Sequence, residues 1–165
     1  MGWRDHKYQR PAWVSRYLAL RYQRHGRGPS FGNVGYDCHG FLMAVYAGEA
    51  GVTIPTLRDG EDGAPDLAAV VNIIDGQGDT WREIAAAPPP APPLSADLAR
   101  DIAQPLDLLI LDPVVDAMHC GVYIGAGEFV HMLTGVGVHV SRLDNGYWRG
   151  HLLGIYRARA MGRRA

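Results

Sequence analysis

The second half of the chain carries short runs of residues that are apolar and partly alternate with polar ones, and turns separate the runs. Four such runs lie at residues 106–111, 119–125, 128–133 and 137–143, and a further run follows at 152–159. A period of two is typical of strands with one buried face, and the intervening Asp-Pro, Gly-Ala-Gly and Thr-Gly sequences favour turns. This half is therefore predicted to form an antiparallel meander, with the last run as a candidate closing strand.

The first half carries helical spacing instead. Residues 11–24 place apolar side chains about one turn apart, and Pro11 suits the first turn of a helix. Residues 25–36 hold four glycines and one proline and are predicted to form a loop. A second helix should begin after Asp37 as N-cap and end at Gly51. Gly40 lies inside this helix, where glycine costs about 1 kcal/mol relative to alanine, so we expect close packing there.

The middle of the chain is less regular. Residues 58–66 are predicted to turn, and residues 66–75 and 81–87 to form short helical pieces. Residues 85–94 contain five prolines and are predicted to cross the surface as a stiff polyproline connector. Helices followed by a sheet predict one α+β domain over residues 1–165.

Composition and charge exclude several classes of protein. A chain of 165 residues can bury a core without a metal or a disulfide, and its net charge of −1 argues against a nucleic-acid partner. The polar N-terminus lacks a signal peptide, and no run approaches the roughly 20 apolar residues of a membrane span. The chain is therefore expected to be made in the cytoplasm. Basic residues gather near both ends, either as an ordinary solvated surface or as a docking patch for a larger assembly.

Cys38 is the first candidate for chemistry, because it sits at the predicted start of a helix. A helix N-terminus carries about half a positive charge and free N–H groups, which stabilise a thiolate and can also face an oxyanion. The alternative is a buried, inert cysteine that packs as a small hydrophobe.

His119 and His131 lie on neighbouring predicted strands and could assist a cysteine nucleophile. A thiol needs a base to take its proton, and a second histidine could orient that base through its other ring nitrogen. Each could instead be a structural histidine. Cys38-His39 and His119-Cys120 offer soft ligands for zinc, but adjacent strand residues point to opposite faces, so His119 and Cys120 cannot easily bind one ion. We therefore expect neither a metal nor another cofactor.

Several sequence blocks, taken together, resemble the NlpC/p60 cell-wall cysteine peptidases. YDCHGFLMAVYAGEAGVTIP (36–55) is similar to their Asp-Cys-Ser-Gly-Phe motif and helix, and LDLLIL (106–111) to their Gly-Asp-Leu-Val strand. HCGVYIGAGEFVHMLTGVGVHVSRL (119–143) resembles their two histidine strands and Val-x-x-Ser-x-Leu strand, and YWRGHLLGIYR (147–157) their C-terminal block. The blocks occur in family order. The resemblance implies a papain-like α+β fold, with the nucleophile at a helix start packed on an antiparallel sheet.

The resemblance also implies roles for individual residues. Cys38 falls on the nucleophile, His119 on the general base and His131 on the third polar residue. Candidates for contacts with the substrate or the oxyanion are Tyr22, Asp37 and His39. This sequence departs from the family pattern in having His39 in place of serine, Leu106 in place of glycine, and the Pro-rich insert.

What the resemblance implies is hydrolysis of peptidoglycan stem peptides, at a bond such as D-Glu to diaminopimelate. His39 and the upstream HGRGPSFG look more like the branch encoded by phages and gene transfer agents. The expected partners are then tail-tip proteins, and the expected place of action is the cell wall. Two alternatives stay open: a structural tail-tip or baseplate protein with a weak or silent site, and an amidase or acyltransferase on the same scaffold.

Overall fold

The computed structural model describes residues 7–55, 78–112 and 119–163, so the turn expected at 58–66 and the helical piece expected at 66–75 lie outside these ranges. The described elements, in chain order, are α1 (Val14–Tyr17), the 3-10 turn η1 (Pro29–Phe31), α2 (Cys38–Val45), the π-helical turn η2 (Tyr46–Ala50), β1 (Trp81–Ala86), α4 (Ala96–Ile102), β2 (Leu108–Leu111), β3 (His119–Gly125), β4 (Glu128–Leu133), β5 (Gly137–Arg142), β6 (Leu152–Ala158) and the 3-10 turn η3 (Arg159–Arg163). None of the helices in these ranges is long or apolar enough to cross a bilayer.

The strands form one antiparallel sheet in the order β1-β6-β2-β3-β4-β5. The meander predicted from the alternating runs is confirmed for β2 to β5, and β6 returns to pair with β2. Helices combined with an antiparallel sheet confirm the predicted α+β class.

Helix α2 begins and continues as predicted. The Asp37 side chain accepts a hydrogen bond from Gly40 N at 2.7 Å, and Gly51 adopts the left-handed conformation with φ 64° after η2. Gly40 is needed for close approach, because a Cβ there would lie 2.3 Å from the Gly26 carbonyl oxygen. The glycine-rich loop before α2 therefore packs directly on the first turn of the helix.

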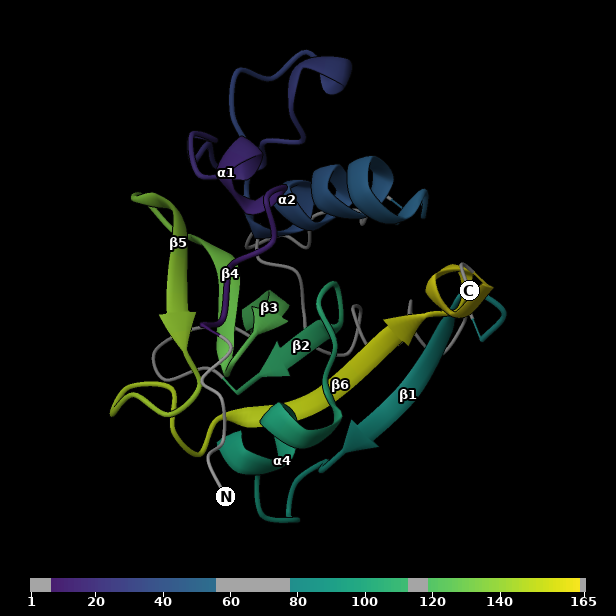
Figure 1. Cartoon of the computed structure of the whole chain (residues 1–165). Helices are drawn as coiled ribbons and strands as arrows, with labels where there is room; N and C mark the ends of the chain where they lie inside the picture. The colour runs from purple at the N-terminus through teal and green to yellow at the C-terminus, as the bar shows by residue number, and fades with distance from the viewer. Residues whose placement is uncertain (1–6, 56–77, 113–118, 164–165) are drawn as a thin grey trace.

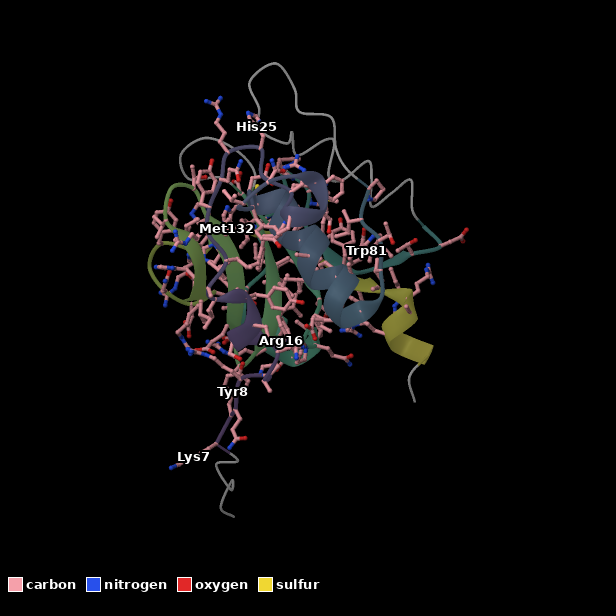
Figure 2. The ribbon with its side chains drawn as sticks, turned by 90° about the horizontal axis from the view of Figure 1, so that it is seen from above. Lys7, Tyr8, Arg16, His25, Trp81 and Met132 are labelled. Carbon is pink, nitrogen blue, oxygen red and sulfur yellow. The ribbon has the colours of Figure 1, made fainter. Side chains whose placement is uncertain are left out.

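Two apolar clusters cover the two faces of the sheet. On one face, Phe41 and Val45 of α2 pack with Val122, Val130 and Met132 of the central strands. On the other face, Ala99 of α4 belongs to a cluster with the following buried residues: Leu109, Leu111, Tyr123, Phe129, Leu143, Trp148, Leu152 and Ile155. Figure 1 shows α2 above the sheet and α4 below it. Seen from above, α2 lies between Trp81 and Met132 (Figure 2).

The structure corrects two predictions about helices. The helix expected over 11–24 is a single turn, α1, in which only Val14 is buried. Trp13, Tyr17 and Leu20 still pack against the α2-side cluster, so these apolar side chains reach the core without a continuous helix. Residues 81–87 were expected to be helical, but 81–86 form β1, which pairs with β6 along the edge of the sheet. Trp81 lies at a centroid distance of 5.0 Å from Tyr46, and this tertiary packing outweighs the helical propensity of the Ala-rich sequence.

The Pro-rich segment is mostly exposed after Ala87, as expected for a surface crossing. It is not a continuous polyproline helix, because Ala91 N donates to the Pro88 carbonyl at 3.0 Å and closes a turn. The short helix α4 then follows, and the hydrophobic pattern did not predict it. Ser95 caps α4 by accepting a hydrogen bond from Leu98 N at 3.0 Å.

A buried ion pair holds the chain where it enters β2. Asp107 is fully buried and accepts from Arg157 Nε at 2.8 Å and Nη2 at 2.7 Å, and from Gln104 N at 2.8 Å. The preceding Leu106 has φ 74°, the left-handed conformation that a glycine adopts without strain. The Leu106 side chain packs against the α2-side cluster, and its carbonyl accepts from the Tyr46 hydroxyl at 2.9 Å.

Replacing Asp107 by Asn should lower the free energy of unfolding by about 3–5 kcal/mol, because the Arg157 charge is left buried without a counter-charge. The matched control is Asp97→Asn. Asp97 pairs with Arg100 while its side chain is 90% exposed, so this variant should lose less than about 1 kcal/mol. Urea unfolding measures both, and equal losses would contradict the importance assigned to the buried pair.

Candidate active site

Cys38 is the first residue of α2, and its thiol is free and half-buried. Burial raises the pKa of this thiol to about 11, and the neighbouring Asp37 carboxylate adds to the rise. The backbone N–H groups of His39 and Cys38 and the Arg27 guanidinium act in the opposite direction. The resting thiol is therefore protonated at neutral pH, and backbone donors already stabilise the charge that appears when the proton leaves.

Asp37 and Arg27 fix the start of α2. Besides capping the helix, the Asp37 carboxylate accepts from Arg27 Nη1 in a buried ion pair. Asp37 N in turn donates to the Gly26 carbonyl at 2.8 Å, so the glycine-rich loop and the helix start are joined on both sides. These contacts fix the backbone position of Cys38.

The two histidines share one face of the sheet. Val122 pairs with Val130, so His119 on β3 and His131 on β4 are diagonal neighbours with the same orientation. His119 Nε2 and His131 Nδ1 are 2.5 Å apart, and the rings are nearly perpendicular at a centroid distance of 4.7 Å. The predicted contact between the two imidazoles is present, and it leaves Nδ1 of His119 as the nitrogen that does not face His131.

Two further residues complete this cluster, and the sequence reasoning missed both. Ser141 Oγ on β5 lies 2.8 Å from His131 Nε2, and the Trp148 indole stacks on His119 at a centroid distance of 5.2 Å. Trp148 also meets His131 edge-on at 5.2 Å. Ser141 lies in the block that resembles Val-x-x-Ser-x-Leu, and Trp148 lies in the C-terminal Tyr-Trp block. Their places in these family blocks were the signal that could have marked them as site residues.

Burial keeps both imidazoles neutral. It lowers the pKa of His119 to about 4. For His131 burial lowers the pKa to about 3, and the nearby His119 and His139 contribute in the same direction. A neutral His119 can accept a proton at pH 7, which is what a general base requires.

The Cys38 thiol and the histidine pair approach the beginning of β3 from different sides. Cys120 points to the face that α2 covers, and the Cys38 thiol is close enough to contribute to the raised pKa of Cys120. His119 points to the face that carries Trp148. Within the described residues no hydrogen bond joins Cys38 to His119, and catalytic hydrogen bonds are often long in the absence of substrate.

The remaining candidates differ in what their side chains can do. Tyr22 forms an isolated β-bridge with Tyr36, which brings it beside the residues leading to Cys38. His39 is buried, and its Nε2 lies 2.8 Å from the Pro55 carbonyl oxygen. Asp37 is occupied by the cap and the ion pair, and a carboxylate repels an oxyanion. The Tyr22 ring packs against the α2-side cluster, and within the described residues its hydroxyl makes no hydrogen bond.

A hollow is found among the described residues, and it lies away from this cluster. Among the described residues no group of three or more His, Cys, Asp or Glu side chains could hold a metal ion. This hollow of about 270 Å³ lies beside α2, and Cys38, His119 and His131 do not line it. Its lining residues are Arg27, Pro29, Ser30, Phe31, Tyr36, Met43, Ala44, Ala47, Thr53 and Ile54.

The low pKa values of the histidines predict a pH-dependent stability. Above pH 6.5 both imidazoles are neutral whether the chain is folded or unfolded. Between pH 6.5 and about 4 the unfolded chain binds protons that the folded chain excludes, so the free energy of unfolding falls as the pH falls. Each such group contributes at most about 1.4 kcal/mol per pH unit.

Replacing His131 by Asn should therefore make the fall in stability between pH 7 and pH 4.5 shallower, whatever the variant's stability at pH 7. Urea unfolding at four pH values measures both slopes. Parallel curves for wild type and His131→Asn would show that His131 is not kept neutral by burial.

Comparisons with known proteins agree with this architecture. The NlpC/P60 family model matches residues 19–157, whereas the search of curated proteins finds no match. An NlpC/P60 family protein from Bacillus cereus ATCC 10987 has a TM-score of 0.54 and 19% identity, covering 90% of this chain and 41% of that one. A protein similar to lipoprotein, NLP/P60 family, from Staphylococcus aureus Mu50 has a TM-score of 0.51 and 22% identity, covering 87% of this chain and 38% of that one.

At these identities the structural likeness concerns the fold, and the chain spans about two fifths of the length of both structures. The family match covers both histidines, Cys38, Ser141 and Trp148. The chain therefore belongs to the NlpC/P60 family.

Proposed function

We propose that this chain is a cysteine endopeptidase that cleaves amide bonds in the stem peptides of peptidoglycan. NlpC/P60 proteins are in general cysteine peptidases or amidases that act on peptidoglycan. The observation that carries the proposal for this chain is the contact between two neutral imidazoles, His119 at the start of β3 and His131 on β4, in a chain whose Cys38 opens α2 and lies near Cys120 on the other side of β3. These are the base, its orienting group and the nucleophile that acyl transfer needs.

The first step starts with Cys38 and His119 both uncharged. Because the pKa of Cys38 is raised to about 11 and that of His119 is lowered to about 4, the thiol keeps its proton until the substrate carbonyl arrives. His119 Nδ1 then removes the proton as Sγ attacks the carbonyl carbon. This transfer requires a closer approach of Cys38 and His119, which we assign to the substrate-bound state.

The tetrahedral oxyanion forms beside the first turn of α2. Gly40 N is already bonded to Asp37, and Phe41 N donates to the Asp37 carbonyl at 2.9 Å. Cys38 N lies at the positive end of the helix and donates to no group within the described residues except its own thiol, and Tyr22 is a candidate second donor. Protonated His119 then gives its proton to the leaving amine, and afterwards activates the water that hydrolyses the thioester at Cys38.

A bond between D-Glu and diaminopimelate is the proposed target. We further propose that the chain belongs to the phage and gene-transfer-agent branch, where a tail tip carries the enzyme to the cell wall. His39 and the loop HGRGPSFG support this branch. In the structure His39 ties the start of α2 to Pro55, a link that the usual serine is too short to reach.

Digestion of purified peptidoglycan, followed by mass spectrometry of the released fragments, tests the activity. Wild type should release new stem-peptide fragments whose ends identify the bond, and Cys38→Ala should release none because the nucleophile is gone. Cys120→Ala is the matched control. It removes the other thiol, which is buried on the α2 side, and should retain cleavage.

Fragments from Cys38→Ala at the wild-type rate would contradict the assignment of the nucleophile. No fragments from a folded wild type would contradict the hydrolase and favour a structural tail-tip part. Cleavage of the bond between sugar and peptide would instead identify an amidase.

A further inference from the structure

His131 uses both ring nitrogens in hydrogen bonds while its side chain is fully buried. Nδ1 lies 2.5 Å from His119 Nε2, and Nε2 lies 2.8 Å from Ser141 Oγ. The register continues the diagonal: Ser141 pairs with Phe129, two residues before His131, so the three side chains share one face across β3, β4 and β5. Together they form a continuous row from His119 to Ser141.

Only two proton arrangements satisfy this row when both rings are neutral. In the first, His119 Nε2–H donates to His131 Nδ1, and His131 Nε2–H donates to Ser141 Oγ. In the second, the Ser141 hydroxyl donates to His131 Nε2, and His131 Nδ1–H donates to His119 Nε2. The first leaves His119 Nδ1 with a lone pair, whereas the second leaves it protonated.

The two arrangements differ in reactivity. A protonated Nδ1 cannot accept the proton of the Cys38 thiol, so only the first arrangement contains a general base. This step rests on the proposed function, since it takes proton transfer from Cys38 as the use of His119. The wrong tautomer is a known way to disable such a base while its geometry is kept.

We propose that Ser141 is a positioning residue that accepts the proton of His131 Nε2 and thereby keeps His119 Nδ1 free. Phe129 and Trp148 surround His131 with aromatic rings, at centroid distances of 4.8 Å and 5.2 Å, which offer no comparable acceptor. Among the described residues Ser141 supplies the oxygen that faces this nitrogen. Ser141 itself is half-exposed, so its own O–H can donate to solvent while its oxygen accepts.

Removing the hydroxyl should change the balance between the tautomers. In Ser141→Ala, the arrangement with the proton on His131 Nε2 leaves this buried N–H without an acceptor. The arrangement with the proton on His131 Nδ1 leaves only the lone pair of Nε2 unfilled. Orphaned buried donors are rarer in proteins than under-satisfied acceptors, so the second arrangement gains population. His119 Nδ1 then carries the proton, and base function is lost without a change in the backbone.

The experiment is long-range ¹H–¹⁵N correlation NMR of the ¹⁵N-labelled full chain at pH 7, which shows the protonated nitrogen of each imidazole. Wild type should carry the proton on Nε2 of both His119 and His131. Ser141→Ala should move most of the His119 proton to Nδ1. Ser141→Thr keeps a hydroxyl at a position that suits a β-branched residue, and should match wild type.

Peptidoglycan cleavage gives the second measurement. Ser141→Ala should lower kcat at least about tenfold with little change in KM, because Ser141 touches the base's partner and not the substrate. Ser141→Thr should restore kcat to within about twofold.

The proposal is overturned if wild-type His119 carries its proton on Nδ1, or if Ser141→Ala leaves both tautomers as in wild type. The tautomers are measured without substrate, so this test of Ser141 does not depend on whether the chain is a hydrolase. An inactive wild type with the expected tautomers would contradict the proposed function, while the role of Ser141 in setting the tautomer would hold.

Discussion

The register in which β4 pairs with β3 and β5 decides which face of the sheet carries the two histidines. Val122 opposite Val130 and Phe129 opposite Ser141 put His119, His131 and Ser141 on one face. A slip of one residue would turn His131 toward α2 and Met132 toward Trp148, breaking both the imidazole contact and the apolar cluster. The strand register that holds the sheet together therefore also fixes the geometry of the imidazole pair.

Burial has opposite effects on the two halves of the site, and both effects favour a neutral resting state. A thiol deprived of water holds its proton more tightly, and an imidazole deprived of water binds one less readily. In the proposed mechanism, charge appears only when the substrate is attacked, beside the helix N–H groups that already act on the Cys38 thiol. The Arg27–Asp37 pair and the close contact of Gly40 with Gly26 hold that helix start in place.

Local signals were sufficient to predict the parts of the molecule that position the site. Alternation predicted β2 to β6, and Asp37 and Gly51 predicted the limits of the α2 segment and its continuation η2. The contact of His119 with His131 followed from their places on adjacent strands.

The strand β1 was missed because its Ala-rich end favours a helix, and the strand gains its order from β6 and Tyr46. The 11–24 helix was overextended, because apolar side chains at helical spacing can pack on a core without a continuous helix, as Trp13, Tyr17 and Leu20 do. Ser141 and Trp148 contact the histidines only after β5 and the following loop have folded back.

The central claim is that His119 acts on the Cys38 thiol although the resting structure joins them by no hydrogen bond within the described residues. The most direct test is the rate at which iodoacetamide alkylates Cys38 at pH 7 in wild type and in His119→Ala, with peptide mapping to separate Cys38 from Cys120. If His119 takes the proton as the sulfur reacts, its removal should slow alkylation at least about tenfold. Equal rates in the two proteins would show that His119 does not serve Cys38 as a base, and would contradict the account.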